Sequence, residues 1–186
     1  MALKNWAISE EIFNKEFCRS LVSECQRRQA AGEFHKASIG HQATKTVDEE
    51  IRGDFIGWLQ ETHPMLENLE LLRQSLNQFF FLGLKRVETH FAFYPPGAGY
   101  EKHIDNPRGR SHRKITFVLY LNENWQKSEG GELSLFDPAN ENERIAQVEP
   151  TLGKLILFRS ELFPHQVEKS FSERLSLTGW FRDDAL

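Results

Sequence analysis

The stretch RVETHFAFY (residues 86–94) decides the fold class of this chain. From residue 86 the residue pattern alternates with a period of two, which is typical of a strand and not of a helix. Such alternation is typical of a strand with two different faces; the residues on one face are Val87, Thr89, Phe91 and Phe93. Further stretches rich in strand-forming residues follow at 115–121, 132–136, 145–149, 154–158 and 174–182. Turn residues separate them, so the segment of about 86–182 is predicted to form a β-sandwich or barrel.

The residues before this segment predict helices. Apolar side chains recur every four residues at Phe13, Phe17, Leu21 and Cys25. A second apolar stripe covers 65–82, whereas residues 33–50 are polar and predict a loop or a loose hairpin. We therefore expect a mainly β fold with N-terminal helices packed on one face. In this arrangement about 1–85 supports the strands, and 1–186 forms one domain.

Composition excludes several classes of protein. The net charge of −4 and the pI of about 6.0 argue against a general nucleic-acid binder, which carries a basic excess. No apolar run approaches the length of a membrane span, and the N-terminus lacks the apolar core of a signal peptide. The two cysteines, Cys18 and Cys25, are predicted to be free thiols on one helix face. A cytoplasmic protein without nucleic-acid or membrane partners is expected.

Four residues carry the chemistry that the sequence suggests. His103 and Asp105 form an H-x-D step, which places both side chains on one face of a strand. His165 follows Pro164 at an expected strand exit and can close the same site from another strand. Two histidines and one carboxylate are the ligand set of non-haem Fe(II) oxygenases. Arg174 can hold a carboxylate through two parallel hydrogen bonds, so the four residues together indicate iron and a dicarboxylate.

A chance match is the first alternative, because the chain has 7 His and 27 Asp+Glu. In that case two of the residues lie on the surface and the second histidine is a satisfied core residue. Turns and strand ends surround the motif, however, and binding groups concentrate at such positions.

Several longer stretches resemble a known family. They are IRGDFIGWL (51–59), FYPPGAGYEKHIDNP (93–107), ITFVLYLNENW (115–125), GGELSLF (130–136), PHQVEKSFSER (164–174) and LTGW (177–180). Through them the chain resembles the Fe(II)/2-oxoglutarate dioxygenases, and among these the protein prolyl 4-hydroxylases of the animal oxygen-sensing type. The resemblance covers roughly residues 30–182 and implies a double-stranded β-helix, also called a jelly roll.

The resemblance also implies roles for individual residues. His103, Asp105 and His165 would bind Fe(II). The 2-oxoglutarate site would comprise Arg174, Tyr120 and Tyr94, the last at the end of the co-substrate nearest the metal. The pocket wall and substrate entrance would comprise Val118, Leu133, Trp180 and Arg113. Residues 33–50 would close over a peptide.

The expected reaction is hydroxylation of a prolyl residue in a protein, with succinate and CO2 as co-products. It would use Fe(II), 2-oxoglutarate and O2, with ascorbate as a reductant, and the resemblance suggests a translation factor such as elongation factor Tu as substrate. The main alternative is a dioxygenase for a free amino acid or another small molecule, since one fold hosts many substrates. A nucleic-acid demethylase is disfavoured by the net charge. A non-catalytic module or a zinc hydrolase would leave Arg174 and Tyr120 without a function.

Other residues have structural interpretations. Arg52-Gly53-Asp54 is predicted to form a turn with a salt bridge, and RGRSHRK (108–114) a solvated rim. His41, His63 and His112 are expected at the surface. Two assignments stay open. His90 shares a strand face with Tyr94, so it either approaches the site or is an ordinary structural histidine. Tyr100 belongs either to the core or to the wall of the site.

Overall fold

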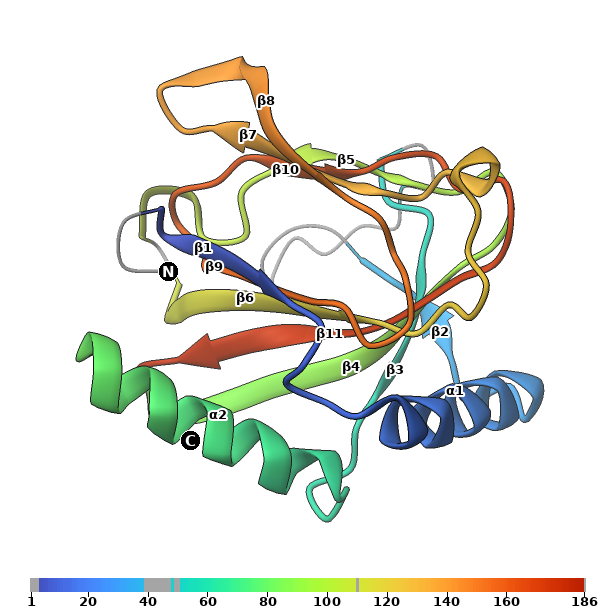
Figure 1. Ribbon diagram of the computed structural model, residues 1–186, viewed down its shortest axis with the longest axis horizontal. Coiled ribbons are helices and arrows are strands. Elements are labelled where there is room, and N and C mark those ends of the chain that lie inside the picture. Colours follow the sequence, from blue (N-terminus) through green and yellow to red (C-terminus); the bar gives the residue numbers. More distant parts are fainter. Residues whose placement is uncertain (1–3, 39–47, 49–50, 110, 186) are drawn as a thin grey trace.

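Two facing β-sheets and two helices make up the computed structural model of the protein, which describes all residues except 1–3, 39–47, 49–50, 110 and 186 (Figure 1). The helices are α1 (Lys15–Ala30) and α2 (Met65–Phe80). The strands are β1 (Trp6–Ser9), β2 (His35–Lys36), β3 (Phe55–Trp58), β4 (Arg86–Tyr94), β5 (Tyr100–His103), β6 (Arg113–Tyr120), β7 (Leu133–Asp137), β8 (Asn140–Val148), β9 (Leu155–Arg159), β10 (His165–Val167) and β11 (Arg174–Arg182).

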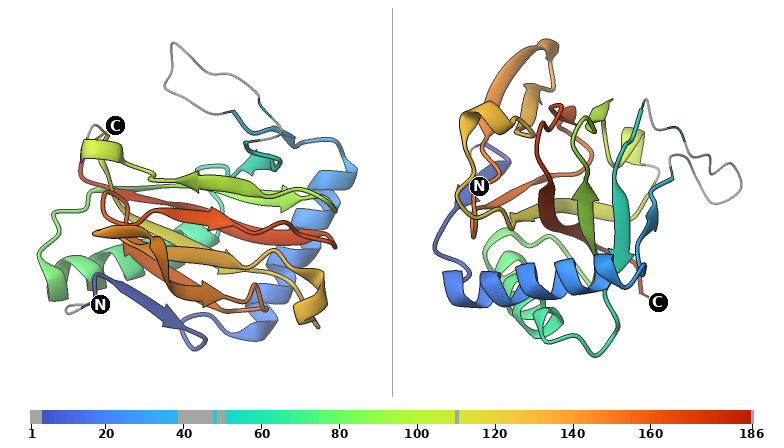
Figure 2. Two further views of the ribbon diagram at one scale, coloured as in Figure 1. Left: turned by 90° about the horizontal axis from the view of Figure 1, so that it is seen from above. Right: turned by 90° about the vertical axis from the view of Figure 1, so that its right-hand side faces the viewer.

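The strands divide into a major and a minor sheet. The major sheet has seven strands in the order β1-β9-β6-β11-β4-β3-β2, and the minor sheet has four in the order β5-β10-β7-β8. Every strand pairing is antiparallel. Both helices cover the face of the major sheet that points away from the minor sheet (Figure 2). The mainly β architecture with helices on one face is confirmed.

Alternation along the major strands divides the interior into two cores. Odd-numbered side chains such as Phe91, Phe117 and Leu177 pack against the helices. Even-numbered side chains such as Tyr94 and Tyr120 point between the two sheets instead. The apolar face that identified the first strand therefore packs under the helices, and the opposite face is available for a site.

The helix ends follow local chemistry. Asn14 caps α1, because its side chain accepts a hydrogen bond from the backbone N–H of Phe17 at 2.7 Å. α1 buries Cys18, Leu21 and Cys25, of which Leu21 and Cys25 follow the predicted four-residue spacing, and both thiols are free. Neither helix of the described part of the chain is long and apolar enough to cross a membrane.

The structure corrects several predicted boundaries. The segment of about 1–85 is not purely helical, because β1 pairs with β9 and β3 pairs with β4. β1 and β3 have four residues each, which is too few for their periodicity to show in the sequence. The strand expected at 145–149 starts at Asn140, since its polar first half pairs with β7. The described part of 33–50 contains β2, whose antiparallel partner β3 lies beyond this stretch, and residues 39–47 and 49–50 lie outside the described residues.

Candidate active site

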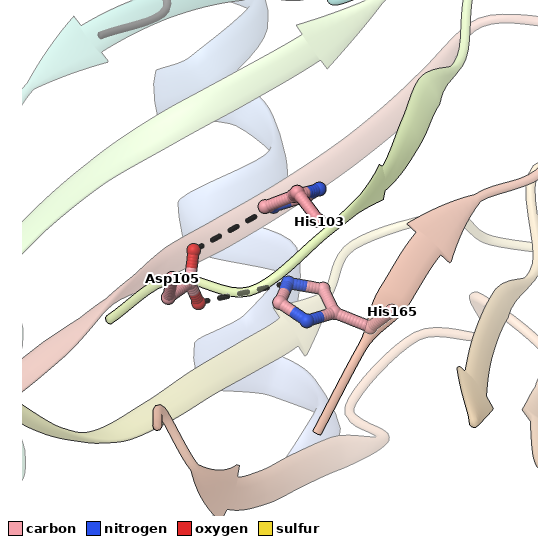
Figure 3. A group of neighbouring side chains, drawn as sticks. All are labelled: His103, Asp105 and His165. Carbon is pink, nitrogen blue, oxygen red and sulfur yellow. Dashed lines mark ion pairs between the residues drawn. The ribbon is translucent and has the colours of Figure 1, made fainter. Parts of the chain in front are cut away.

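The predicted metal triad comes together at one end of the minor sheet. His103 is the last residue of β5 and His165 the first residue of β10, and the two are direct partners in the antiparallel register. Asp105 lies two residues beyond the end of β5, so the expectation that it shares a strand with His103 is wrong. His165 begins a strand rather than following one. The chain turns after His103, and this turn brings the Asp105 carboxylate to face both imidazoles, one oxygen toward each ring (Figure 3).

The geometry of the triad is that of a metal site. Each carboxylate oxygen of Asp105 lies 3.6 Å from a different histidine Nε2, and the three ligand atoms lie within 4.8 Å of one another. The Nδ1 atoms of His103 and His165 lie 2.8 and 3.0 Å from the backbone carbonyls of Glu101 and Phe163. A carbonyl only accepts, so Nδ1 carries the proton and the Nε2 lone pair faces Asp105. Two imidazole nitrogens and one carboxylate suit Fe(II).

The surroundings set the charge states that a metal requires. Burial alone would raise the pKa of Asp105, but the adjacent His165 and His103 and the hydroxyl of Thr116 outweigh it and hold this pKa well below its usual range. Thr116 Oγ1 donates to Asp105 Oδ2 at 2.6 Å and also lies 2.9 Å from the hydroxyl of Ser160. Burial lowers the pKa of His165 to about 4. At neutral pH the carboxylate is therefore charged and the imidazole neutral.

Arg174 is a buried cation without a counter-ion in the part of the chain that the structure describes. Its side chain is nearly inaccessible, at 3% exposure, and its Nε and Nη1 donate to the Gly131 carbonyl at 2.7 Å and to the Ser176 hydroxyl at 3.3 Å. Among the described residues no carboxylate lies within ion-pair distance of it. The fully buried Tyr120 hydroxyl has no hydrogen-bond partner in the same part of the chain. The buried guanidinium has hydrogen bonds but no counter-ion in this part of the chain, and a ligand carboxylate would supply one beside the Tyr120 hydroxyl.

The remaining predicted pocket residues fall into two groups. Tyr94, Val118 and Leu133 are buried in the core between the sheets together with Tyr120. The Arg174 guanidinium lies 4.9 Å from the Tyr94 ring and 5.2 Å from the Tyr120 ring.

Trp180 belongs to the second group, near the far end of β11. The Arg113 guanidinium covers its ring at 3.4 Å and is paired with Glu88 at 3.4 Å. Val118 pairs with Thr178 on β11, two residues from Trp180, so the two groups adjoin along the inner face of the major sheet, and Leu133 faces them from the minor sheet.

His90 joins this second group. Its ring lies 4.8 Å from Trp58 and 5.6 Å from Trp180, and neither ring nitrogen has a partner among the described residues. Burial lowers its pKa to about 3, so it is uncharged. The indole nitrogen of Trp180 is also buried without a partner. Buried polar atoms are almost always hydrogen-bonded, so these three nitrogens mark a place for a polar ligand group or water.

Other histidines behave in different ways. His63 is half-buried and paired with Glu24 at 2.8 Å, so its predicted surface position is wrong. His112 is exposed as expected and pairs with Asp183 at 2.9 Å. His41 lies outside the described residues.

Residues that support the site were missed in the sequence. The hydroxyls of Thr116 and Ser160 and the ring of Trp58 have no motif that marks them. The alternation in 115–121 nonetheless places Thr116 on the same face as Val118 and Tyr120, a signal that could have identified it. The predicted salt bridge between Arg52 and Asp54 is confirmed at 2.7 Å.

Residues 89–182, about half of the chain, match the family model described as the 2OG-Fe(II) oxygenase superfamily. The chain belongs to this superfamily. The fold is accordingly its double-stranded β-helix, and the family's cofactors, Fe(II), 2-oxoglutarate and O2, are those that the triad and Arg174 accommodate.

Within this superfamily, the chain is similar to several prolyl hydroxylases. The human prolyl hydroxylase EGLN3 is 33% identical, with 90% of this chain and 76% of that protein aligned. A crystal structure of a Pseudomonas putida prolyl-4-hydroxylase superimposes with a TM-score of 0.87 at 41% identity and covers 97% of this chain and 94% of that one. A Trichoplax adhaerens prolyl hydroxylase in complex with a hypoxia-inducible factor peptide gives a TM-score of 0.80 at 27% identity, covering 98% and 85%. The chain spans only about half the length of some curated relatives, such as 43% of human Egl nine homolog 1.

Proposed function

We propose that this chain is a prolyl 4-hydroxylase that depends on Fe(II) and 2-oxoglutarate and acts on a prolyl residue of a protein. Two observations together carry the proposal: the His103–Asp105–His165 triad, and the buried Arg174, which has no counter-ion among the described residues. A triad alone would serve many metal enzymes, whereas the unpaired guanidinium needs an anionic co-substrate. The similarity to prolyl hydroxylases over nearly the whole chain supports the type of substrate, and 1–186 would then work as one dioxygenase domain.

In this proposal His103, Asp105 and His165 hold iron through two Nε2 atoms and one carboxylate. Bound iron supplies the oxidation itself, in which 2-oxoglutarate and O2 are converted to succinate and CO2 while the proline gains a hydroxyl. The protein's own contribution is orientation and charge. The Nδ1–H bonds keep both Nε2 atoms unprotonated, and the Thr116 hydroxyl keeps Asp105 ionised and in place.

The co-substrate would lie along the inner face of the major sheet. Arg174 and the Tyr120 hydroxyl would bind its distal carboxylate, which satisfies both unpaired groups at once. Tyr94 would line the end nearer the metal. Val118 and Leu133, buried in the same core cluster as Tyr94 and Tyr120, would exclude water from the co-substrate site and so strengthen the attraction between the guanidinium and a carboxylate.

The substrate would enter at the other end of the inner face. Arg113 and Trp180 were expected there, and the structure adds Trp58 and the uncharged His90 as neighbours. Aromatic rings with a few unpaired polar atoms suit a proline ring flanked by peptide groups. The Trichoplax relative is described with a bound peptide, which favours a protein substrate over a small molecule. A translation factor such as elongation factor Tu, encountered in the cytoplasm, is the first candidate.

The test is mass spectrometry of candidate proteins after incubation with the enzyme, Fe(II), 2-oxoglutarate, ascorbate and O2. We expect one added oxygen atom on a single prolyl residue, and none with the His165→Ala variant. Hydroxylation of a free amino acid with no modification of any protein would instead establish the small-molecule alternative. Wild-type protein that binds no 2-oxoglutarate in the presence of Fe(II) would overturn both.

A further inference from the structure

A stack of side chains connects the N-terminal part of the chain to one metal ligand. The Tyr100 ring lies parallel to the His103 imidazole, with centroids 3.7 Å apart and an angle of 19°. The Arg52 guanidinium lies over the same Tyr100 ring at 4.8 Å. Tyr100 therefore faces a metal ligand and also packs against the core between the sheets, so both interpretations that the sequence left open apply.

Arg52 is held rigidly in this position. Its Nε and Nη2 donate to the two carboxylate oxygens of Asp54 at 2.7 and 3.0 Å, and Asp54 is itself almost inaccessible. The backbone is fixed as well, because Gly53 N–H donates to the Gly99 carbonyl at 3.0 Å and Arg52 forms an isolated antiparallel bridge with Tyr100. A two-pronged ion pair and a backbone pairing together leave the guanidinium little freedom.

His103 needs support that His165 does not. His165 is buried, and the Phe158 ring lies against it at 4.7 Å. His103 ends an edge strand, and 20% of its side chain is exposed. Its Nδ1–H bond to the Glu101 carbonyl fixes one point of the ring but not its plane. The His165 ring lies 4.3 Å away but is tilted by 55°, so Tyr100 is the ring that stacks nearly parallel to the imidazole and restrains its plane.

We propose that Arg52, acting through Tyr100, is a positioning residue of the metal site. The cation over the Tyr100 ring and the ring over His103 hold the imidazole so that Nε2 faces Asp105 before metal binds. The inference rests on the metal site of the proposed function and is independent of the proposed substrate. Its consequence is metal affinity, which can be measured without turnover.

The experiment is titration of the full chain with Co(II), whose visible absorption reports its ligand geometry. We expect Tyr100→Leu and Arg52→Gln to raise the Co(II) dissociation constant by about tenfold or more and to shift the spectrum, as loss of supporting contacts does at other metal sites. Tyr100→Phe keeps the ring and should bind as wild type does. Arg52→Lys keeps a cation and should recover part of the loss.

Lys102 provides a matched control. It lies next to His103 on β5, and its ammonium lies 3.8 Å from the Phe136 ring, which stacks on no metal-binding histidine in the described part of the chain. Lys102→Met should therefore leave Co(II) binding unchanged. Thermal unfolding of each metal-free variant separates the two possible roles, because a purely structural role lowers the melting temperature without changing the affinity of the folded protein.

Unchanged Co(II) affinity in both Tyr100→Leu and Arg52→Gln would overturn the inference, and an effect of Tyr100→Leu alone would remove Arg52 from it. If Arg52→Gln fails to fold because Asp54 is left unpaired, the double variant Arg52→Gln/Asp54→Asn takes its place. Wild-type protein that binds no Co(II) would count against the proposed function itself, whereas wild-type binding with unaffected variants would count only against this inference.

Discussion

Replacement of Arg174 by lysine tests the co-substrate site most directly. The substitution keeps the buried positive charge but loses the planar fork that can bind both oxygens of a carboxylate. Breaking one side of a buried, hydrogen-bonded charge pair costs about 2–5 kcal/mol. The lower figure corresponds to about 30-fold weaker binding of 2-oxoglutarate, since about 1.4 kcal/mol is tenfold. Because Arg174 lies on β11 and the triad lies on and beside the minor-sheet strands β5 and β10, Fe(II) binding should persist.

The assay is thermal unfolding under anaerobic conditions with Fe(II) and increasing 2-oxoglutarate. A ligand at about 100 times its dissociation constant stabilises the folded state by about 2.7 kcal/mol. The same concentration stabilises a variant with about 30-fold weaker binding by only about 0.9 kcal/mol. For a chain of this length the difference of about 1.8 kcal/mol corresponds to a melting temperature about 4–7 °C lower.

Arg182→Lys is the control for this experiment. Arg182 lies at the end of the same strand, but its guanidinium is paired within the protein, with Asp184 at 2.9 Å and Glu88 at 2.7 Å. It should alter the melting temperature equally with and without 2-oxoglutarate. Equal stabilisation of wild type and Arg174→Lys by 2-oxoglutarate would refute the assignment of Arg174.

Three further predictions follow from buried polar groups. Thr116→Val removes the hydroxyl that donates to Asp105 and should weaken metal binding about tenfold by titration, whereas Thr178→Val, which loses a bond to a backbone carbonyl, should not. Burial lowers the pKa of His90 to about 3 in the folded protein, against about 6.5 in the unfolded chain. The folded state should therefore lose up to about 1.4 kcal/mol of stability per pH unit as the pH falls from about 6.5 to about 3. Urea unfolding of His90→Leu should show a smaller loss over the same range. Burial raises the pKa of Cys25 to about 12, so a thiol reagent near pH 8 should label it only after unfolding, and fast labelling of folded protein would contradict the buried position.

The strands that carry a strong period could be predicted from sequence, and the short ones could not. The alternation in 86–94 and 174–182 is long enough to identify β4 and β11 and to show which residues share a face. β5 and β10 have four and three residues, and their polar residues give no periodic signal. They form because neighbouring strands supply their hydrogen bonds, which is a tertiary effect.

In the candidate site, too, some features could be predicted from the sequence and others could not. The identities of His103, Asp105, His165 and Arg174 were visible in the sequence, because the chemistry of a metal and a carboxylate restricts the residue types that bind them. Their convergence depends on the pairing of His103 with His165 across β5 and β10, which joins segments about sixty residues apart.

The supporting residues were decided by the tertiary structure alone. The sequence predicted a salt bridge at Arg52 and a strand face for Thr116, but each acquires its role at the site only when folding places it against Tyr100 or Asp105. Ligand identity is constrained by chemistry and so appears in the sequence, whereas the orientation of a ligand depends on contacts between distant segments, which only the folded chain creates.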